Sequence, residues 1–238
     1  MRRLPADFAA LLTPKGRRAL SAPGTLTEAA PFAWIAGAIG SGTAAAMEAL
    51  LEKTLAPHLV PLAEPIAPEL ISRQTRNYME RLPKVARLRT AYLERTDSRA
   101  WRAAERIGLI TMLGSSGLRR LAEAAAGRRL DARPGFQLLR YGPGDYQGPH
   151  TDHHPEDRRA RDGYIDIHVS LPSPDVADQF MVFARKGHLS EMVNVAAPGG
   201  IAVYRLPFWH LTTPLRAKRG RARDARRWVI LGTFLFAE

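Results

Sequence analysis

Two histidines and one aspartate in the second half of the sequence are candidate metal ligands. His150 and Asp152 follow a Pro/Gly turn at residues 141–144 and end a short predicted strand. Because strand side chains alternate between two faces, His150 and Asp152 point the same way. His210 lies between an apolar stretch and a Thr-Thr-Pro sequence and would complete the set. Two histidines and a carboxylate that leave coordination positions open suit non-haem Fe(II) chemistry with oxygen.

Two further histidines, His153 and His154, come directly after Asp152 and leave the choice of ligand open. Continued alternation puts His154 on the face of Asp152 and His153 on the other face. A solvated loop is the ordinary place for consecutive polar residues of this kind. We therefore expect both to lie in a loop beside the metal ligands rather than to bind the metal.

Arg227 is a candidate anion-binding residue. It opens the last predicted strand, and it shares parity with Val229, Leu231 and Thr233, so it would face the inside of a barrel. A buried arginine needs an anionic partner, and its guanidinium matches a carboxylate with two parallel hydrogen bonds. The alternative is an arginine at a strand edge that pairs with a carboxylate of the protein itself.

The elements that must position these residues begin with helices. The apolar pattern predicts a helix over residues 43–53. Ser98 is a candidate N-cap for a second helix, and Ser116 begins a third that ends at Gly127. Residues 70–93 are basic, with apolar residues at helical spacing.

From Pro134 the pattern changes to short strands with turn signals between them. The predicted strands are residues 136–141, 163–171, 180–183, 201–205 and 228–236. The second of these alternates between an apolar face (Ile165, Ile167, Val169, Leu171) and a polar face (Asp166, His168, Ser170). Helices followed by many short antiparallel strands predict an α+β protein with a sandwich or barrel of the jelly-roll type.

The composition narrows the classes of function. The 238 residues include no cysteine, which excludes disulfides and thiolate metal sites and fits a cytoplasmic protein. Residues 29–47 carry no charge, but they are rich in Gly and Ala, so we expect no membrane span. The net charge is +12, and seven Lys or Arg residues fall between 216 and 227. Such an excess is typical of proteins that bind nucleic acids or anionic substrates, and also of solvated loops.

Residues 134–238 resemble the Fe(II)/2-oxoglutarate-dependent dioxygenases, most nearly their prolyl-4-hydroxylase-like branch. The resemblance rests on features that occur in the family's order: the turn Tyr141-Gly142-Pro143-Gly144, the pair His150 and Asp152, the turn Pro198-Gly199-Gly200, His210 followed by Pro214, and Arg227. The first 115 residues carry no motif of this family. We therefore expect residues 1–115 to form a mainly helical extension that packs on a core of residues 116–238.

The resemblance implies a double-stranded β-helix that holds Fe(II) at its open end through His150, Asp152 and His210. It also implies 2-oxoglutarate as cosubstrate and O₂ as oxidant, with release of succinate and CO₂. Arg227 corresponds to the family's basic residue that binds the far carboxylate of the cosubstrate.

Two more cosubstrate contacts are implied by the same resemblance. Tyr141 matches the tyrosine of the family's first strand. His168 falls where these hydroxylases often have a tyrosine, and a histidine can supply the same hydrogen bond. The alternative for His168 is a strand histidine whose hydrogen bonds are satisfied within the protein.

For the substrate, the sequence favours a small molecule or a peptide side chain. We expect the basic loop, residues 216–226, to overhang the mouth of the site, where it would attract an anionic substrate, or to be solvated. No aromatic residues are interleaved with its basic ones, so nucleic acid is not favoured. The long gap from His210 to Arg227 nevertheless resembles the superfamily's nucleic-acid demethylases, which stay an alternative. A catalytically silent β-helix binding protein is the other.

Overall fold

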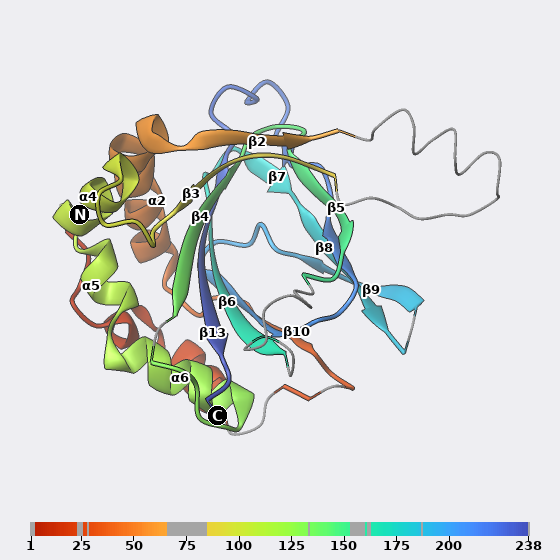
Figure 1. Cartoon of the computed structure of the whole chain (residues 1–238). Coiled ribbons are helices and arrows are strands. Elements are labelled where there is room, and N and C mark those ends of the chain that lie inside the picture. Colours follow the sequence, from red (N-terminus) through yellow and green to blue (C-terminus); the bar gives the residue numbers. More distant parts are fainter. Residues whose placement is uncertain are drawn as a thin grey trace.

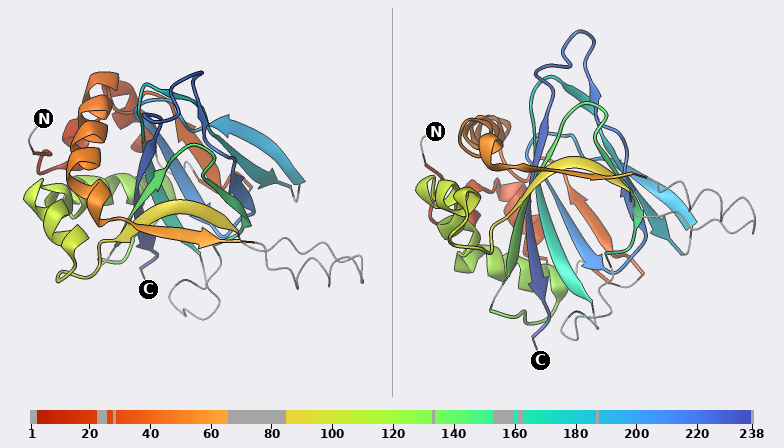
Figure 2. Two further views of the ribbon diagram at one scale, coloured as in Figure 1. Left: turned by 90° about the horizontal axis from the view of Figure 1, so that it is seen from above. Right: turned by 45° about the horizontal axis from the view of Figure 1, so that its top comes forward.

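The structure is a computed structural model that describes residues 3–22, 26–27, 29–65, 85–132, 134–152, 160, 163–186 and 188–237. Helices pack on one side of a large antiparallel sheet, and the sheet curves back on itself (Figures 1 and 2). This is the predicted α+β arrangement, a double-stranded β-helix core with supporting helices. Among the described helices, none has the length and hydropathy needed to cross a membrane.

The helices of the described residues all end before Gly127. They are η1 (Phe8–Leu11), α1 (Pro14–Leu20), α2 (Ser41–Leu55), η2 (Ala56–His58), α4 (Arg99–Arg106), α5 (Leu109–Leu113) and α6 (Ser116–Ala126). The predicted helix at 43–53 and the Ser98 cap are confirmed. The N-cap of α6 is Ser115 and not Ser116, because the Ser115 hydroxyl accepts the bond from Leu118 N–H. Gly127 ends that helix with φ 66°, a left-handed conformation that glycine adopts without strain.

The strands are β1 (Phe32–Ile35), β2 (Val60–Glu64), β3 (Ala86–Tyr92), β4 (Gly135–Tyr141), β5 (Tyr146–His150), β6 (Tyr164–Pro172), β7 (Val176–Asp178), β8 (Phe180–Arg185), β9 (His188–Asn194), β10 (Gly200–Leu206), β11 (His210–Thr212), β12 (Arg216–Ala217) and β13 (Arg227–Leu235). The main sheet runs in the order β1-β10-β6-β13-β4-β3-β5-β11-β8-β9, and β2 pairs with β3. Strand β13 is central, as predicted, since it pairs with β4 on one side and β6 on the other.

Strand β3 corrects the helical interpretation of residues 70–93. Residues 86–92 form a strand whose even-numbered positions Ala86, Leu88 and Thr90 are buried. Small and polar residues at those positions give a weak alternation that is easily mistaken for helical spacing. Residues 66–84 lie outside the described residues.

Strand β3 pairs with both β4 and β5, so a strand from the first half joins the two sides of the sheet. The predicted division at residue 115 stays a prediction.

The alternation predicted for β6 is confirmed. Its apolar side chains Ile165, Ile167, Val169 and Leu171 belong to the core that the helices cover. Its polar set lies on the opposite, inner side of the sheet, where Asp166 and His168 line a cavity.

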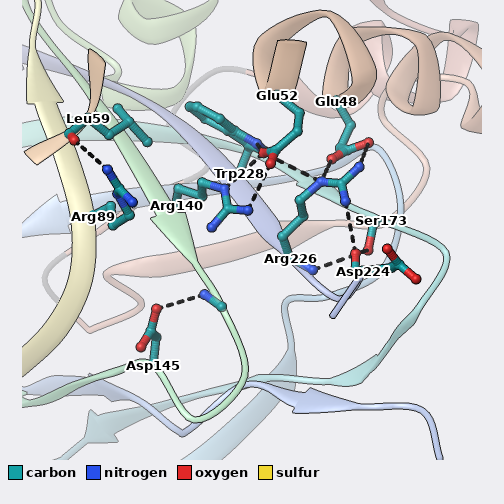
Figure 3. Close-up of polar contacts among 11 residues, drawn as sticks. Glu48, Glu52, Leu59, Arg89, Arg140, Asp145, Ser173, Asp224, Arg226 and Trp228 are labelled. Atoms are coloured by element: carbon teal, nitrogen blue, oxygen red, sulfur yellow. Dashed lines mark hydrogen bonds and ion pairs between the residues drawn. The ribbon is translucent and has the colours of Figure 1, made fainter. Parts of the chain in front are cut away.

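Helix α2 is attached to the outer face of the sheet by charged groups as well as by its apolar side. Glu52 accepts hydrogen bonds from the guanidinium of Arg140 on β4 and from the indole Nε1 of Trp228 on β13 (Figure 3). One turn earlier, Glu48 Oε1 accepts from Arg226 Nε at 2.6 Å. We call these five residues the α2 cluster. They fix the outer side of the segment where β13 begins, directly beside Arg227.

Candidate metal centre

The predicted ligands His150, Asp152 and His210 come together in the structure. His150 ends β5, His210 begins β11, and these two residues are directly paired across the strands. The Nε2 atoms of His150 and His210 lie 3.3 and 3.4 Å from Asp152 Oδ2. One ligand atom from each residue lies within 4.8 Å of the others, and both histidines are buried.

Hydrogen bonds to the backbone determine which nitrogen of each histidine is free. His150 Nδ1 lies 2.6 Å from the carbonyl oxygen of Gly148, and His210 Nδ1 lies 2.9 Å from that of Phe208. A carbonyl oxygen only accepts, so in the neutral rings Nδ1 carries the proton and Nε2 presents a lone pair. Two lone pairs and a carboxylate oxygen thus face one point, which a divalent cation would stabilise. The residues fit a metal ion.

The protonation states of Asp152 and His210 also suit metal binding. Burial alone would raise the pKa of the Asp152 carboxyl, but its contacts with His150 and His210 outweigh burial and hold that pKa below its ordinary value. Burial lowers the pKa of His210 below its ordinary value, against the opposing effect of Asp152. An ionised carboxylate and a neutral imidazole are the forms that bind metals.

Asp152 reaches the site by a different route from the one predicted. The strand ends at His150, and Asp152 has a φ of 52°, in the left-handed region. Aspartate tolerates this conformation better than most residues. The side chain therefore turns back toward His150 through the backbone of Asp152 rather than through strand alternation. His153 and His154 lie outside the described residues.

The three residues line a cavity of about 890 Å³ inside the curved sheet. Apolar side chains from β4, β8 and β13 cover much of its wall, among them Leu139, Met181, Val229 and Leu231. Tyr92 and Glu94, which are exposed, line it too, so the cavity opens to solvent on their side. The volume suits a small molecule together with part of a larger ligand.

Arg227 lies in the wall of this cavity and is 4% exposed. Its Nε donates to Ser170 Oγ at 2.9 Å, and its Nη1 donates to Gln179 Oε1 at 2.6 Å. Among the described residues it has no carboxylate partner, and burial lowers its pKa. The guanidinium still stays charged, since its ordinary pKa is far above neutrality. A buried cation held only by neutral groups is a ready site for an anionic ligand.

The other two predicted cosubstrate residues also line the cavity. The Tyr141 hydroxyl donates to Gln147 Oε1 at 2.7 Å, and its ring lies under Arg227, with 5.2 Å from the guanidinium carbon to the ring centre. Burial raises the pKa of Tyr141 to about 12, so the hydroxyl keeps its proton. His168 packs against the ring of Tyr204, which in turn contacts His210.

Two residues that hold Arg227 were missed from the sequence. Ser170 is on β6, and Gln179 lies between β7 and β8, fully buried, where its Nε2 donates to the carbonyl oxygens of Asp145 and Thr213. The alternation of β6 put Ser170 on the inner face and was a usable signal for it. Gln179 lies outside any strand, and nothing in its local sequence indicates its burial.

The prediction that the basic loop overhangs the mouth of the site is wrong. None of residues 216–226, all of them described, lines the cavity. The loop instead packs beside β7, where Arg221 Nε lies 2.8 Å from Asp175 and Arg216 Nε 3.7 Å from Asp178. Arg226, at its end, is bound to Glu48 on the outer side of the sheet.

Comparison with solved structures gives several similar folds. A prolyl-4-hydroxylase from Pseudomonas putida has a TM-score of 0.54 at 16% identity, over 97% of this chain and 100% of that chain. A prolyl hydroxylase from Trichoplax adhaerens, in complex with a hypoxia inducible factor peptide, has a TM-score of 0.53 at 13% identity, over 92% and 90%. The non-heme α-ketoglutarate-dependent epimerase SnoN has a TM-score of 0.53 at 15% identity, over 93% and 83%. No protein-family model and no curated protein matches the sequence.

The comparisons show the fold, and the geometry of the described residues shows the metal-binding cluster. The chain has the double-stranded β-helix of the Fe(II)/2-oxoglutarate oxygenases, with a buried His-Asp-His cluster placed to hold a metal. The fold that the sequence resemblance implies is thereby confirmed, and prolyl hydroxylases are among the structures to which the fold is similar.

Proposed function

We propose that this protein is a non-haem Fe(II)- and 2-oxoglutarate-dependent dioxygenase that hydroxylates a small molecule or a peptide side chain. One observation carries the proposal. A single cavity contains both a cluster of three metal-binding acceptors and a buried arginine without an acidic partner among the described residues. A metal site alone, or an anion site alone, is common; the two in one cavity fit a metal-bound 2-oxo acid with a second carboxylate.

In this proposal His150, Asp152 and His210 bind Fe(II). The Nδ1–H groups of the two histidines donate to the carbonyl oxygens of Gly148 and Phe208, and these bonds fix both rings before the metal binds. Asp152 supplies the negative charge. Fe(II) bound there would supply the activation of O₂ that is coupled to the decarboxylation of 2-oxoglutarate to succinate and CO₂.

Arg227 binds the far carboxylate of 2-oxoglutarate in this proposal. Ser170 and Gln179 act as positioning residues, since each accepts from one side of the guanidinium and leaves its other N–H groups for the ligand. The Tyr141 ring supports Arg227 from below, and His168 contacts the cosubstrate from β6. Val229 and Leu231 keep water away from it.

The test is calorimetric titration of the chain with Fe(II) and then 2-oxoglutarate without oxygen, followed by measurement of succinate after oxygen is added. We expect metal-dependent binding of 2-oxoglutarate and slow succinate formation even without substrate. Binding without any succinate would identify the catalytically silent alternative. Absence of metal-dependent 2-oxoglutarate binding would overturn the proposal.

A further inference from the structure

Asp166 is a buried carboxylate that the cosubstrate proposal does not use. It lies on the inner face of β6, lines the cavity and is only 4% exposed. Its Oδ1 has no hydrogen-bond partner, and Nε2 of the neighbouring His168 has none either. Among the described residues, His168 Nε2 approaches the Asp166 Oδ2 atom to 3.6 Å, which is longer than a hydrogen bond.

A buried carboxylate without a partner destabilises a fold, because it loses its hydration and gains no hydrogen bonds in return. Among the described residues, its nearest possible partner is His168, whose own Nε2 is also without a hydrogen bond. Arg227 is bound to Ser170, four residues further along β6, which is about 13 Å at the rise of a strand. An unpaired buried polar group that faces a cavity calls for a partner that enters from the cavity, such as water, an ion or a ligand.

The position of Asp166 points to the substrate rather than to 2-oxoglutarate. Across the sheet Asp166 pairs with Thr233, and Thr233 pairs with Gly135 on β4. Glu94 Oε1 lies 3.3 Å from the place where a Cβ on Gly135 would stand. This row of residues therefore ends at exposed Glu94, on the open side of the cavity, whereas Arg227 is at the opposite end of β6 and β13.

The charged residues that line the cavity also differ between the Arg227 end and the open end. Among the described residues, Arg227 is the only Lys or Arg in its wall, while Glu64, Glu94 and Asp166 add carboxylates apart from the ligand Asp152. The rings of Tyr92, Tyr164 and Tyr204 also line the cavity and suit a cation.

We propose that Asp166 binds a protonated nitrogen group of the substrate, an amine or a guanidinium, with Glu94 at the entrance. The proposal rests on the proposed function, and it deepens it by naming the substrate class. A guanidinium or ammonium would donate to Asp166 Oδ1, which has no other hydrogen-bond partner among the described residues. This replaces the sequence-based expectation of an anionic substrate, which depended on a loop that does not reach the cavity.

The test uses four probes of one size: butylamine, butylguanidine, butanol and butyrate. Each is titrated into the chain loaded with Fe(II) and 2-oxoglutarate without oxygen, and into the chain without either. We expect the two cations to bind at least about tenfold more tightly than butanol and butyrate. The variant Asp166→Asn should remove this preference and keep metal-dependent 2-oxoglutarate binding, because Arg227, which holds the far carboxylate in this proposal, is distant. Asp97→Asn, a matched change at an exposed residue, should keep it.

Thermal unfolding of the same variants adds a second measurement. Asn has the shape of Asp without the charge, so Asp166→Asn should raise the melting temperature if the carboxylate serves a ligand. Equal binding of all four probes, or an unchanged preference in Asp166→Asn, would overturn the inference. A lower melting temperature with unchanged probe binding would show a structural role and overturn it too. If Fe(II) and 2-oxoglutarate bind normally in these cases, the proposed function itself stands.

Discussion

Arg226 and Arg227 are adjacent at the start of β13, but they have different partners because neighbouring side chains face opposite sides of the sheet. Arg226 points outward to Glu48, and Arg227 points inward to Ser170 and Gln179. Breaking a buried, hydrogen-bonded charge pair costs about 2–5 kcal/mol, and about 1.4 kcal/mol is a factor of ten. Arg227→Ala should therefore raise the Kd for 2-oxoglutarate at least about thirtyfold, with Fe(II) binding unchanged, as calorimetry can measure.

Arg226→Ala is the matched control for that experiment. It removes an equal charge from the next position, but on the outer face, so the Kd for 2-oxoglutarate should change by less than about threefold. Its effect should appear in stability, because Glu48 would lose its partner. A large loss of 2-oxoglutarate affinity in Arg226→Ala with little in Arg227→Ala would mean that the register of β13 is off by one residue.

Asp152 is the only acid in the three-residue cluster, so its loss should abolish metal binding. A ligand present at 100 times its Kd stabilises a fold by about 2.7 kcal/mol, which a melting curve detects easily. We expect Fe(II) to raise the melting temperature of the native chain and to leave that of Asp152→Ala unchanged. His153→Ala should keep the native response. If His153→Ala loses it instead, the wrong histidine has been assigned.

The sequence predicts an inward residue better than it predicts the partner of that residue. Alternation within each strand put Arg227 inside the barrel and put Asp166 and His168 together on the polar face of β6, and all three line the cavity. The bond from Arg227 to Gln179 depends on how separate segments meet across the barrel, and no local pattern contains that information. Asp152 was placed correctly, but through a left-handed backbone that alternation does not predict.

Helix α2 holds the outer face of the sheet beside the segment that carries Arg227. Glu52 accepts from Arg140 and Trp228, so Glu52→Ala would leave two partly buried donors unpaired. Hydrogen bonds of charged groups contribute about 1.5–3 kcal/mol, and partial exposure of this pair favours the lower end. We expect a loss of about 2 kcal/mol in the free energy of unfolding, measured by urea denaturation. Glu191→Ala breaks an exposed pair with Arg185 and should cost less than about 1 kcal/mol.

The helices themselves were predictable, whereas the α2 cluster was not. Caps and apolar spacing are local signals, and they placed α2, α4 and α6 to within a residue or two. The pair of Glu48 with Arg226 joins residues 178 positions apart. On the sequence alone, both read as charges on solvated faces. Strand β3 was not predicted either, because a short strand with small buried residues gives only a weak alternation.

The fold as a whole depends on the first half of the chain for more than support. Strand β3 is hydrogen-bonded to β4 and to β5, and β1 extends the sheet beside β10. The apolar side of α2 shares one core with Ile167, Val169 and Ile230 from the second half of the chain. The motifs of the family resemblance all lie after residue 134, yet the residues that enclose them do not.

A chain that begins at Ser116 should therefore fail to fold. It would keep α6 and all the proposed ligands, but it would lose β3, which joins β4 to β5, and it would expose the apolar face of β6 and β13 to water. Burial of such side chains is the main source of stability. The free energy of unfolding of a domain is only about 5–15 kcal/mol, so this loss would exceed it. Circular dichroism and urea titration of this fragment should show no cooperative transition, and calorimetry should show no 2-oxoglutarate binding. A cooperatively folded fragment that binds 2-oxoglutarate would instead make residues 1–115 a separable extension, and β3 would then be replaceable at the junction of the two sides.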